Sequence, residues 1–218
     1  MIKKSLLLGS AIALFACAAH ADVLWSQPWD GSASFFSSQN DTSGGNGNFA
    51  TTYDDFTLTG ASSVTGANFT GAFFNPATAA PISGFTVKIY QDNAGSIGGV
   101  LDSEFVSFTQ SSLGSPGGFP AFEYNVALTP VSLAAGTYWI SFVPDLGYPP
   151  QWGTATSSVG TNNAQQTFFS STSSLNNNMA FDVLGGSGTP EPAAWALMLT
   201  GFGAAGVMLR RARRTALA

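Results

Sequence analysis

Residues 83–95 read SGFTVKIYQDNAG and carry the clearest secondary-structure signal in the chain. Apolar side chains at Phe85, Val87 and Ile89 alternate with more polar ones. Because successive side chains of a strand point to opposite faces, this alternation predicts a half-buried β-strand. The turn sequence DNAG, residues 92–95, follows directly, so the strand is expected to lead into a hairpin.

The same period of two recurs on both sides of this segment. It is present in PAFEYNVAL (120–128) and NMAFDVLG (178–185), whereas GTYWISFVP (136–144) has large side chains on both faces, as expected of a strand covered on both sides. Further strands are expected within residues 53–60, 64–74, 100–109 and 164–170.

No convincing helical period occurs between residues 22 and 188, and Gly, Pro, Asn and Ser turns separate the strand-like segments. About seven to ten short strands at such spacing predict an all-β fold. We expect a two-sheet antiparallel sandwich, jelly-roll-like, over residues 22–184. The polar stretch 37–48, SSQNDTSGGNGN, is predicted to be a loop.

Charge is concentrated at the two ends of the 218-residue chain. Basic residues lie at positions 3–4 and 210–214, and Lys88 is the only one between them. Eleven carboxylates lie between Asp22 and Asp182, which gives this body a net charge of about -10. Binding to nucleic-acid phosphates needs clustered Lys and Arg, so the composition excludes a nucleic-acid partner.

Residues 1–21 predict a secretory signal peptide with a short apolar helix. Two lysines precede an apolar run at 6–16, and AHA at 19–21 is a small-x-small cleavage site. As an alternative, LFAC at 14–17 resembles a lipoprotein box in which Cys17 would be lipidated, although Phe15 is bulky for that role. Cleavage after residue 21 would leave a mature chain without Cys or His, and so without an internal disulfide.

The C-terminal region predicts a single transmembrane helix over residues 193–209. This uncharged stretch would span about 26 Å as a helix, close to the roughly 30 Å of a hydrocarbon core. A Gly/Pro linker at 185–192 precedes it and a basic tail at 210–218 follows, which favours a cytoplasmic tail and an external body. The GxGxxG spacing at 201–206 lacks the preceding strand and the following acidic residue that a dinucleotide site requires.

The combination of Pro190, Glu191, Pro192, Trp195, a glycine-rich apolar span and terminal arginines resembles the PEP-CTERM sorting signal of exported Gram-negative bacterial proteins. The arginines are Arg210, Arg211, Arg213 and Arg214. The resemblance implies that an exosortase, an integral-membrane Cys transpeptidase-like enzyme, recognises the Pro-Glu-Pro sequence and releases the body from its tail. It also implies an inner-membrane precursor, a final location at the cell surface or outside the cell, and an association with exopolysaccharide production. A plain stop-transfer helix is the alternative.

Three segments of the body, at 53–56, 84–95 and 133–144, resemble a β-sandwich domain that recurs among PEP-CTERM proteins. The resemblance covers most of residues 23–184 and carries no established activity with it.

The body has little of the usual catalytic chemistry. Without His, Cys or Arg it has no Ser-His or Cys-His nucleophile system, no bidentate anion clamp and no typical zinc ligands. Lys88 lies mid-strand, where a solvated outward side chain is expected. Paired carboxylates could hydrolyse glycosides if two of them faced each other across a cleft. The candidates are Asp54, Asp55, Asp102, Glu104 and Glu123.

Asp54 and Asp55 are adjacent, so in a regular strand one of them points inward. A buried carboxylate needs a partner, and Ca²⁺ with oxygen ligands is one option. Hydrogen bonds from backbone amides are the alternative, and we favour it.

Tyr148 and Trp152 lie in YPPQWG (148–153), where prolines predict a stiff loop that could expose both rings as a platform for sugar rings. Aromatic side chains are more often core residues, so this second interpretation stays open. Three functions therefore remain: a non-enzymatic extracellular matrix protein associated with exopolysaccharide, which we favour, a carbohydrate-binding module, and a carboxylate-dependent glycoside hydrolase.

Overall fold

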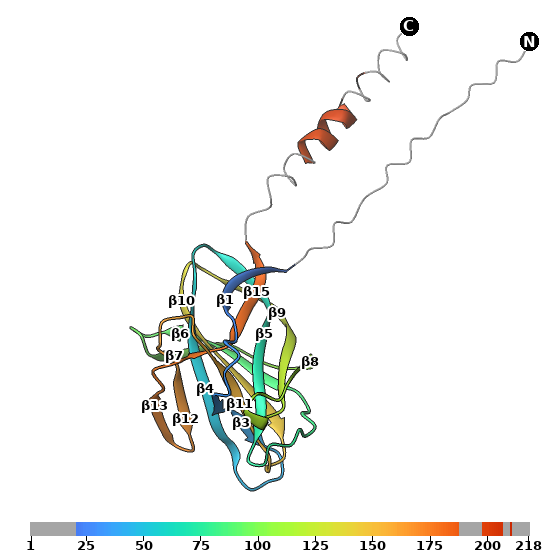
Figure 1. The fold of residues 1–218 in the computed structure, drawn as a ribbon. Coiled ribbons are helices and arrows are strands. Elements are labelled where there is room, and N and C mark those ends of the chain that lie inside the picture. The colour runs from blue at the N-terminus through green and yellow to red at the C-terminus, as the bar shows by residue number, and fades with distance from the viewer. Residues whose placement is uncertain (1–20, 188–197, 207–209, 211–218) are drawn as a thin grey trace, which may run out of the picture.

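The computed structural model describes residues 21–187, 198–206 and 210, and it folds residues 22–187 into two β-sheets packed face to face (Figure 1). The eight-stranded sheet contains β1 (Asp22–Gln27), β2 (Phe35–Ser37), β5 (Ser62–Phe74), β8 (Phe108–Gly114), β9 (Ala121–Leu133), β11 (Gln151–Ser157), β14 (Asn178–Met179) and β15 (Phe181–Ser187). The seven-stranded sheet contains β3 (Gln39–Asp41), β4 (Gly47–Leu58), β6 (Phe85–Asp92), β7 (Ile97–Val106), β10 (Gly136–Leu146), β12 (Gln165–Phe168) and β13 (Ser171–Ser174). A single 3₁₀ turn, η1 (Pro116–Gly118), connects β8 to β9.

The predicted hairpin after residue 85 is confirmed as β6–β7. Asn93 and Ser96 exchange backbone hydrogen bonds across the turn, and Ala94 and Gly95 both have positive φ, 53° and 81°. Two consecutive left-handed residues match the right-handed twist of the flanking strands. The strand β10 is also covered on both faces as expected, since Trp139 and Ile140, which point to opposite sides, are each at most 1% exposed.

Three features of the fold differ from the sequence prediction. The described residues contain fifteen strands, more than the seven to ten expected. The strand β3 pairs with β10 in parallel, so the seven-stranded sheet is mixed and not purely antiparallel. The stretch 37–48 is not simply a loop, because it contains β3 and the start of β4. Short polar strands of this kind lack the apolar alternation that reveals a strand in a sequence.

The core between the sheets is built around stacked aromatic rings. Phe69 of β5 stacks on Phe142 of β10 with ring centroids 4.1 Å apart, and it meets Phe85 of β6 edge to face at 4.9 Å. Because these residues come from both sheets, the ring contacts join the two layers. Offset-stacked and edge-to-face ring pairs of this kind add about 0.5–1.5 kcal/mol each beyond the burial of their area.

The sandwich extends beyond its predicted end at residue 184. Gly185 and Gly186, expected in the linker at 185–192, lie in β15 opposite Val64 and Ser63. A Cβ atom on Gly185 would come within 2.1 Å of the Ser63 carbonyl oxygen, so this glycine permits close strand approach. The first of the predicted linker glycines therefore serves packing between strands.

Both ends of the sandwich lie side by side, because β1 pairs with β15 and Asp22 lies opposite Gly185 (Figure 1). The described residues leave out positions 1–20 of the predicted signal peptide, the Pro190–Pro192 sequence, Trp195 and three of the four tail arginines. Within the predicted span 193–209, the residues described as helical are 198–206. Among the described residues, no helix has the length and apolar character needed to cross a membrane.

Candidate functional site

Trp152 belongs to the core, and its assignment to an exposed platform was wrong. It is 0% exposed, its indole Nε1 donates to the Tyr124 hydroxyl at 3.1 Å, and its ring lies so close to Gly71 that a Cβ there would come within 2.0 Å of a ring carbon. The strand β11 begins at Gln151, directly after the prolines, and turns this tryptophan toward the facing sheet. The loop predicted over residues 148–153 therefore ends at Pro150, directly before β11 begins.

Tyr148 instead joins a different group of rings, which we call the aromatic patch: Phe49, Tyr148, Phe168 and Phe169. Phe49 is buried at the centre, and its ring centroid lies 5.8–6.0 Å from each of the other three. The outer three are 37%, 40% and 60% exposed in the order of their numbers. The aromatic patch combines residues from β4, β12 and the loop after β10. Because these segments are far apart in the chain, the sequence alone does not reveal this exposed apolar surface.

The backbone at the tip of the patch is strained. Phe169, in the turn between β12 and β13, has φ of 52°, a left-handed conformation that bulky side chains rarely adopt. This conformation costs a non-glycine residue about 1–2 kcal/mol, and Asn or Gly adopts it more readily. The turn between β12 and β13 has two residues, and such tight turns require positive φ, so the hairpin accounts for this conformation and leaves the ring 60% exposed.

Asp41 fastens the loop that carries Tyr148. Its Oδ1 accepts hydrogen bonds from the Tyr148 amide at 3.0 Å and from the Ser43 amide and hydroxyl, and its Oδ2 accepts from the amide and side chain of Asn46. The Ser43 hydroxyl above all, together with these amides, holds the pKa of Asp41 well below its usual range. The charged carboxylate of Asp41 thus fixes the backbone position of Tyr148. Asp41 belongs to the stretch 37–48, which the sequence analysis predicted to be a loop.

Asp54 and Asp55 are both buried, at 1% and 5% exposure, but they face different surroundings. The two oxygens of Asp54 accept from the backbone amides of Asp55 at 2.9 Å and Met179 at 2.7 Å, which links β4 to β14. Burial raises the pKa of Asp54 to about 8 even though these amides pull it down. Asp55 accepts from the Thr161 hydroxyl at 2.5 Å. Backbone amides, the alternative that we favoured, therefore occupy the oxygens of Asp54 that a Ca²⁺ ion would need.

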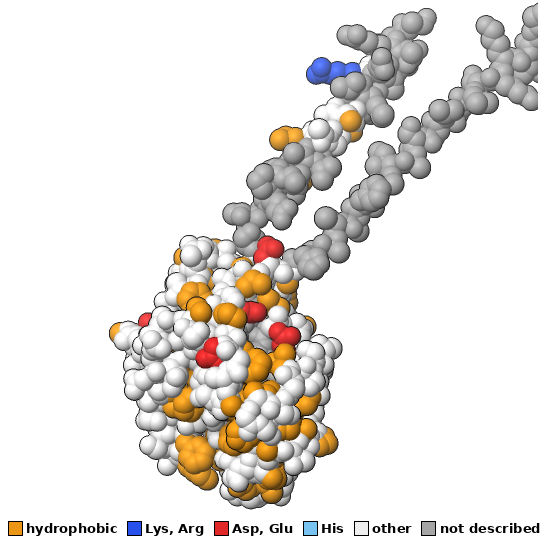
Figure 2. All heavy atoms as spheres, in the orientation of Figure 1, with side chains coloured by type: hydrophobic (Ala, Val, Ile, Leu, Met, Phe, Trp, Pro, Cys, Tyr) orange, Lys and Arg blue, Asp and Glu red, His pale blue; other side chains and the backbone are white. Residues whose placement is uncertain are grey.

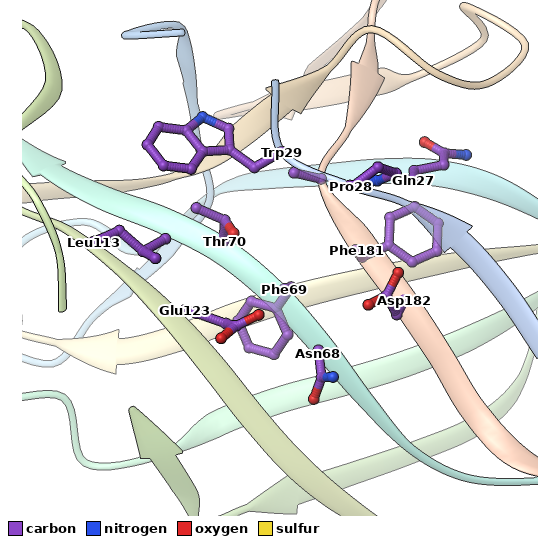
Figure 3. A pocket seen from close by; sticks show the side chains of 11 residues that line it. Gln27, Pro28, Trp29, Asn68, Phe69, Thr70, Leu113, Glu123, Phe181 and Asp182 are labelled. Carbon is purple, nitrogen blue, oxygen red and sulfur yellow. The ribbon is translucent and has the colours of Figure 1, made fainter. Parts of the chain in front are cut away.

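A groove crosses the outer face of the eight-stranded sheet, where a cavity of about 230 Å³ lies beside one of about 280 Å³. Asn68 and Glu123 line both cavities, and Trp29 and Asp182 line the first. Figure 3 shows Trp29 above Thr70, with Asn68, Glu123 and Asp182 projecting from three neighbouring strands. The groove offers amide and carboxylate groups beside the Trp29 ring, a mixture that suits a hydroxylated ligand.

The two carboxylates of this groove have hydrogen-bond partners on different outer strands. Glu123 on β9 accepts from Ser111 on β8 at 3.5 Å, and Asp182 on β15 accepts from Ser26 on β1 at 2.6 Å. The strands β8 and β1 flank the group on opposite sides. Asp182 and Glu123 pair with Asn68 and Thr70 of the intervening β5, so ordinary strand spacing puts their Cα atoms about 12 Å apart.

The other candidate carboxylates do not join this groove. Asp102 and Glu104 lie on β7 of the seven-stranded sheet, where Glu104 accepts from the Thr129 amide at 2.9 Å and its hydroxyl at 3.2 Å. Within the part of the chain that the structure describes, no three His, Cys, Asp or Glu side chains gather in a way that could hold a metal ion. Figure 2 shows that acidic side chains on the visible face lie in the half of the sandwich where β1 begins and β15 ends.

The chain matches no protein-family model, no curated protein and no solved structure.

Proposed function

We propose that this chain is an exported bacterial surface or extracellular matrix protein, and that its sandwich associates with exopolysaccharide without catalysing a reaction. In this proposal a signal peptide exports the chain, residues 193–209 anchor the precursor in the inner membrane, and an exosortase cleaves near Pro190–Pro192. Within this proposal, the sandwich associates with exopolysaccharide by binding its sugar residues directly.

The aromatic patch is the observation that carries the proposal. Its three outer rings, Tyr148, Phe168 and Phe169, present apolar faces to solvent around the buried Phe49. The negatively polarised face of an aromatic ring attracts the C–H groups of a sugar ring while leaving the sugar hydroxyls in water. Such a surface suits long neutral or acidic polysaccharides and needs no catalytic group.

The position of the patch supports an anchored orientation. Ser187 at the end of β15 pairs with Ser62 at the start of β5, and the turn between β4 and β5 lies at that same end of the sandwich. Phe49 lies at the other end of β4, which is twelve residues long. The patch is therefore at the end of the sandwich away from the start of β1 and the end of β15, so a tail that continues from Ser187 would leave it free.

The groove favours binding over hydrolysis. A glycosidase needs its two carboxyl groups roughly 5–9.5 Å apart on either side of the scissile bond. Glu123 and Asp182 are instead held by Ser111 and Ser26 on the outer strands. The carboxyl with the raised pKa, Asp54, is only 1% exposed and lies between the sheets, where a substrate has no access to it.

The sorting part of the proposal is tested by intact mass spectrometry of the mature protein recovered from its own host. We expect a species that starts at Asp22 and ends close to Pro190, and a tail-bearing species when Glu191→Ala is introduced. The conservative Thr200→Ser within the span is the matched control and should leave processing unchanged. A mature wild-type protein that keeps its tail would support the plain stop-transfer helix instead.

A further inference from the structure

Lys88 is the single basic residue of the sandwich, and it lacks an internal partner. It lies on β6 in register with Ser141 of β10 and Ser103 of β7, and its side chain is half-buried. No hydrogen bond or ion pair to any described residue engages its ammonium group. Although the body has eleven carboxylates, none of the described ones pairs with Lys88. Its half-buried ammonium group is therefore available to an external anion.

Lys88 lines a polar cavity of about 200 Å³ on the outer face of the seven-stranded sheet. No described carboxylate lines this cavity. The lining groups that matter here are neutral hydroxyls and amides, from Asn40, Asn48, Thr51, Tyr53, Tyr90 and Ser141. The acid that neighbours Asn40, Asp145, accepts a hydrogen bond from the Asn40 side chain at 2.8 Å.

Two tyrosines shape one wall of the cavity. The rings of Tyr53 and Tyr90 meet edge to face with centroids 5.5 Å apart, and the Tyr90 hydroxyl pairs with Ser141 at 3.1 Å. Burial raises the pKa of Tyr90 to about 12, so this hydroxyl stays neutral and adds no negative charge that would repel an anion. The site therefore combines one cation with fixed aromatic and hydroxyl groups.

We propose that this cavity binds the carboxylate-bearing ring of an acidic sugar, a hexuronate residue. The ammonium group of Lys88 would pair with the carboxylate, the amides and hydroxyls would contact the ring hydroxyls, and the tyrosines would contact ring carbons. At about 200 Å³ the cavity is smaller than a site for a drug-sized ligand and suits one ring. Asn48 lines the cavity, and the next residue along β4, Phe49, centres the aromatic patch.

The test is a titration of the full-length chain, in a zwitterionic detergent without a sugar headgroup, with sodium glucuronate. The chain has three lysines, Lys3, Lys4 and Lys88, so side-chain Cε–H resonances in a lysine-labelled sample are assignable by comparison with Lys88→Met. We expect saturable shifts of the Lys88 resonance with glucuronate, weaker binding as ionic strength rises, and none with glucose. Binding of glucuronate detected by calorimetry should fall at least tenfold in Lys88→Met and be retained in Lys88→Arg.

The control variant is Asp102→Asn on the neighbouring β7, a residue that lines neither this cavity nor the groove on the other sheet, and it should bind glucuronate like the wild-type protein. Equal glucuronate binding by wild type and Lys88→Met would overturn the inference, as would the absence of saturable shifts. Acetate or inorganic phosphate binding as tightly as glucuronate would overturn the assignment to a sugar. Each of these failures leaves binding of neutral glycans at the aromatic patch intact, so they are distinguishable from a failure of the proposed function.

Discussion

Polar side chains between the two sheets differ from Lys88 and Glu123 on the outer faces in how fully their donors and acceptors are used. Between the sheets, Asp54 accepts two backbone amides, and the hydroxyls of Thr52 and Thr154 join the layers at 2.9 Å. On the outer faces, Lys88 has no partner among the described residues, and Glu123 has one contact at 3.5 Å.

We infer from this difference that the interior polar groups stabilise the fold and that the two outer-face groups are available for binding. Buried polar groups are costly unless paired, so the interior uses its groups to fix the sandwich. The pairing is not complete, since the Gln27 Oε1 and Trp25 Nε1 atoms are buried without a protein partner. Groups with unused hydrogen-bonding capacity on an outer face can bind a ligand without disturbing the fold. We therefore expect substitutions between the sheets to lower the free energy of unfolding strongly, and substitutions of Lys88 or Glu123 on the outer faces to lower it little.

The largest effect is expected for Trp152→Ala. The substitution empties the space over Gly71 and leaves the Tyr124 hydroxyl without its indole partner. Loss of a large buried ring of this kind costs about 3–5 kcal/mol. Urea unfolding followed by near-UV circular dichroism measures it, with Trp152→Phe as the milder control. A Trp152→Ala protein of wild-type stability would refute the placement of this ring in the core.

Asp54→Asn is expected to have a smaller effect on stability at acidic pH, and Asp54 gives the protein a defined pH dependence. Because burial raises its pKa from 3.8 to about 8, the folded protein holds a proton that the unfolded chain releases. Its stabilising contribution is complete below the unfolded pKa and is lost as the pH rises to about 8, at up to about 1.4 kcal/mol per pH unit.

Asp54→Asn should remove this dependence. The amide of Asn can accept from one of the two backbone amides, but its NH₂ group meets the other, so we also expect a loss of about 1–3 kcal/mol at acidic pH. Urea unfolding at a series of pH values from 4 to 9 compares the two proteins. The same slope in the variant would mean that another group carries the pH dependence.

Asp41, at the rim of the sandwich, should show the opposite pH dependence. Its pKa is held low by Ser43 and three backbone amides, so its contribution is present above the ordinary pKa of 3.8 and is lost as the pH falls below it. Asp41→Asn should therefore lower the melting temperature at pH 7. Hydrogen exchange of the Tyr148 amide should become faster. An unchanged Tyr148 amide would show that Asp41 does not fasten this loop.

The smallest stability effects are expected on the two outer faces. Lys88→Met and Glu123→Gln should each change the free energy of unfolding by no more than about 0.5 kcal/mol, because neither side chain is tied to the interior. Urea unfolding under identical conditions provides the values. A decrease of more than about 2 kcal/mol in the free energy of unfolding of either variant would contradict the difference between interior and outer-face groups.

The sequence was sufficient for the elements whose apolar period is regular, and insufficient for the sites. The β6–β7 hairpin and the doubly covered β10 follow from local patterns around Phe85 and Trp139. The position of Trp152 was predicted wrongly because the preceding prolines indicate a loop, whereas the strand β11 starts immediately after them.

Long-range pairing explains what could not be predicted. The patch forms because β12 pairs with β4, which brings Phe168 and Phe169 to Phe49. The outward orientation of Lys88 was expected, but its cavity is closed by Asn40, Tyr53 and Ser141 from three other strands. No spacing within the sequence encodes these contacts.

Binding to exopolysaccharide at the aromatic patch is tested most directly with Phe169→Asn. Asn adopts the left-handed backbone of residue 169 more readily than Phe, so the variant removes an exposed ring while the fold is kept within about 1 kcal/mol. The measurement is a calorimetric titration of the full-length chain, in zwitterionic detergent, with the exopolysaccharide purified from its own host. We predict saturable binding by the wild-type protein and at least tenfold weaker binding by Phe169→Asn at an unchanged or higher melting temperature. Equal binding by both proteins, or none by the wild type, would contradict the account.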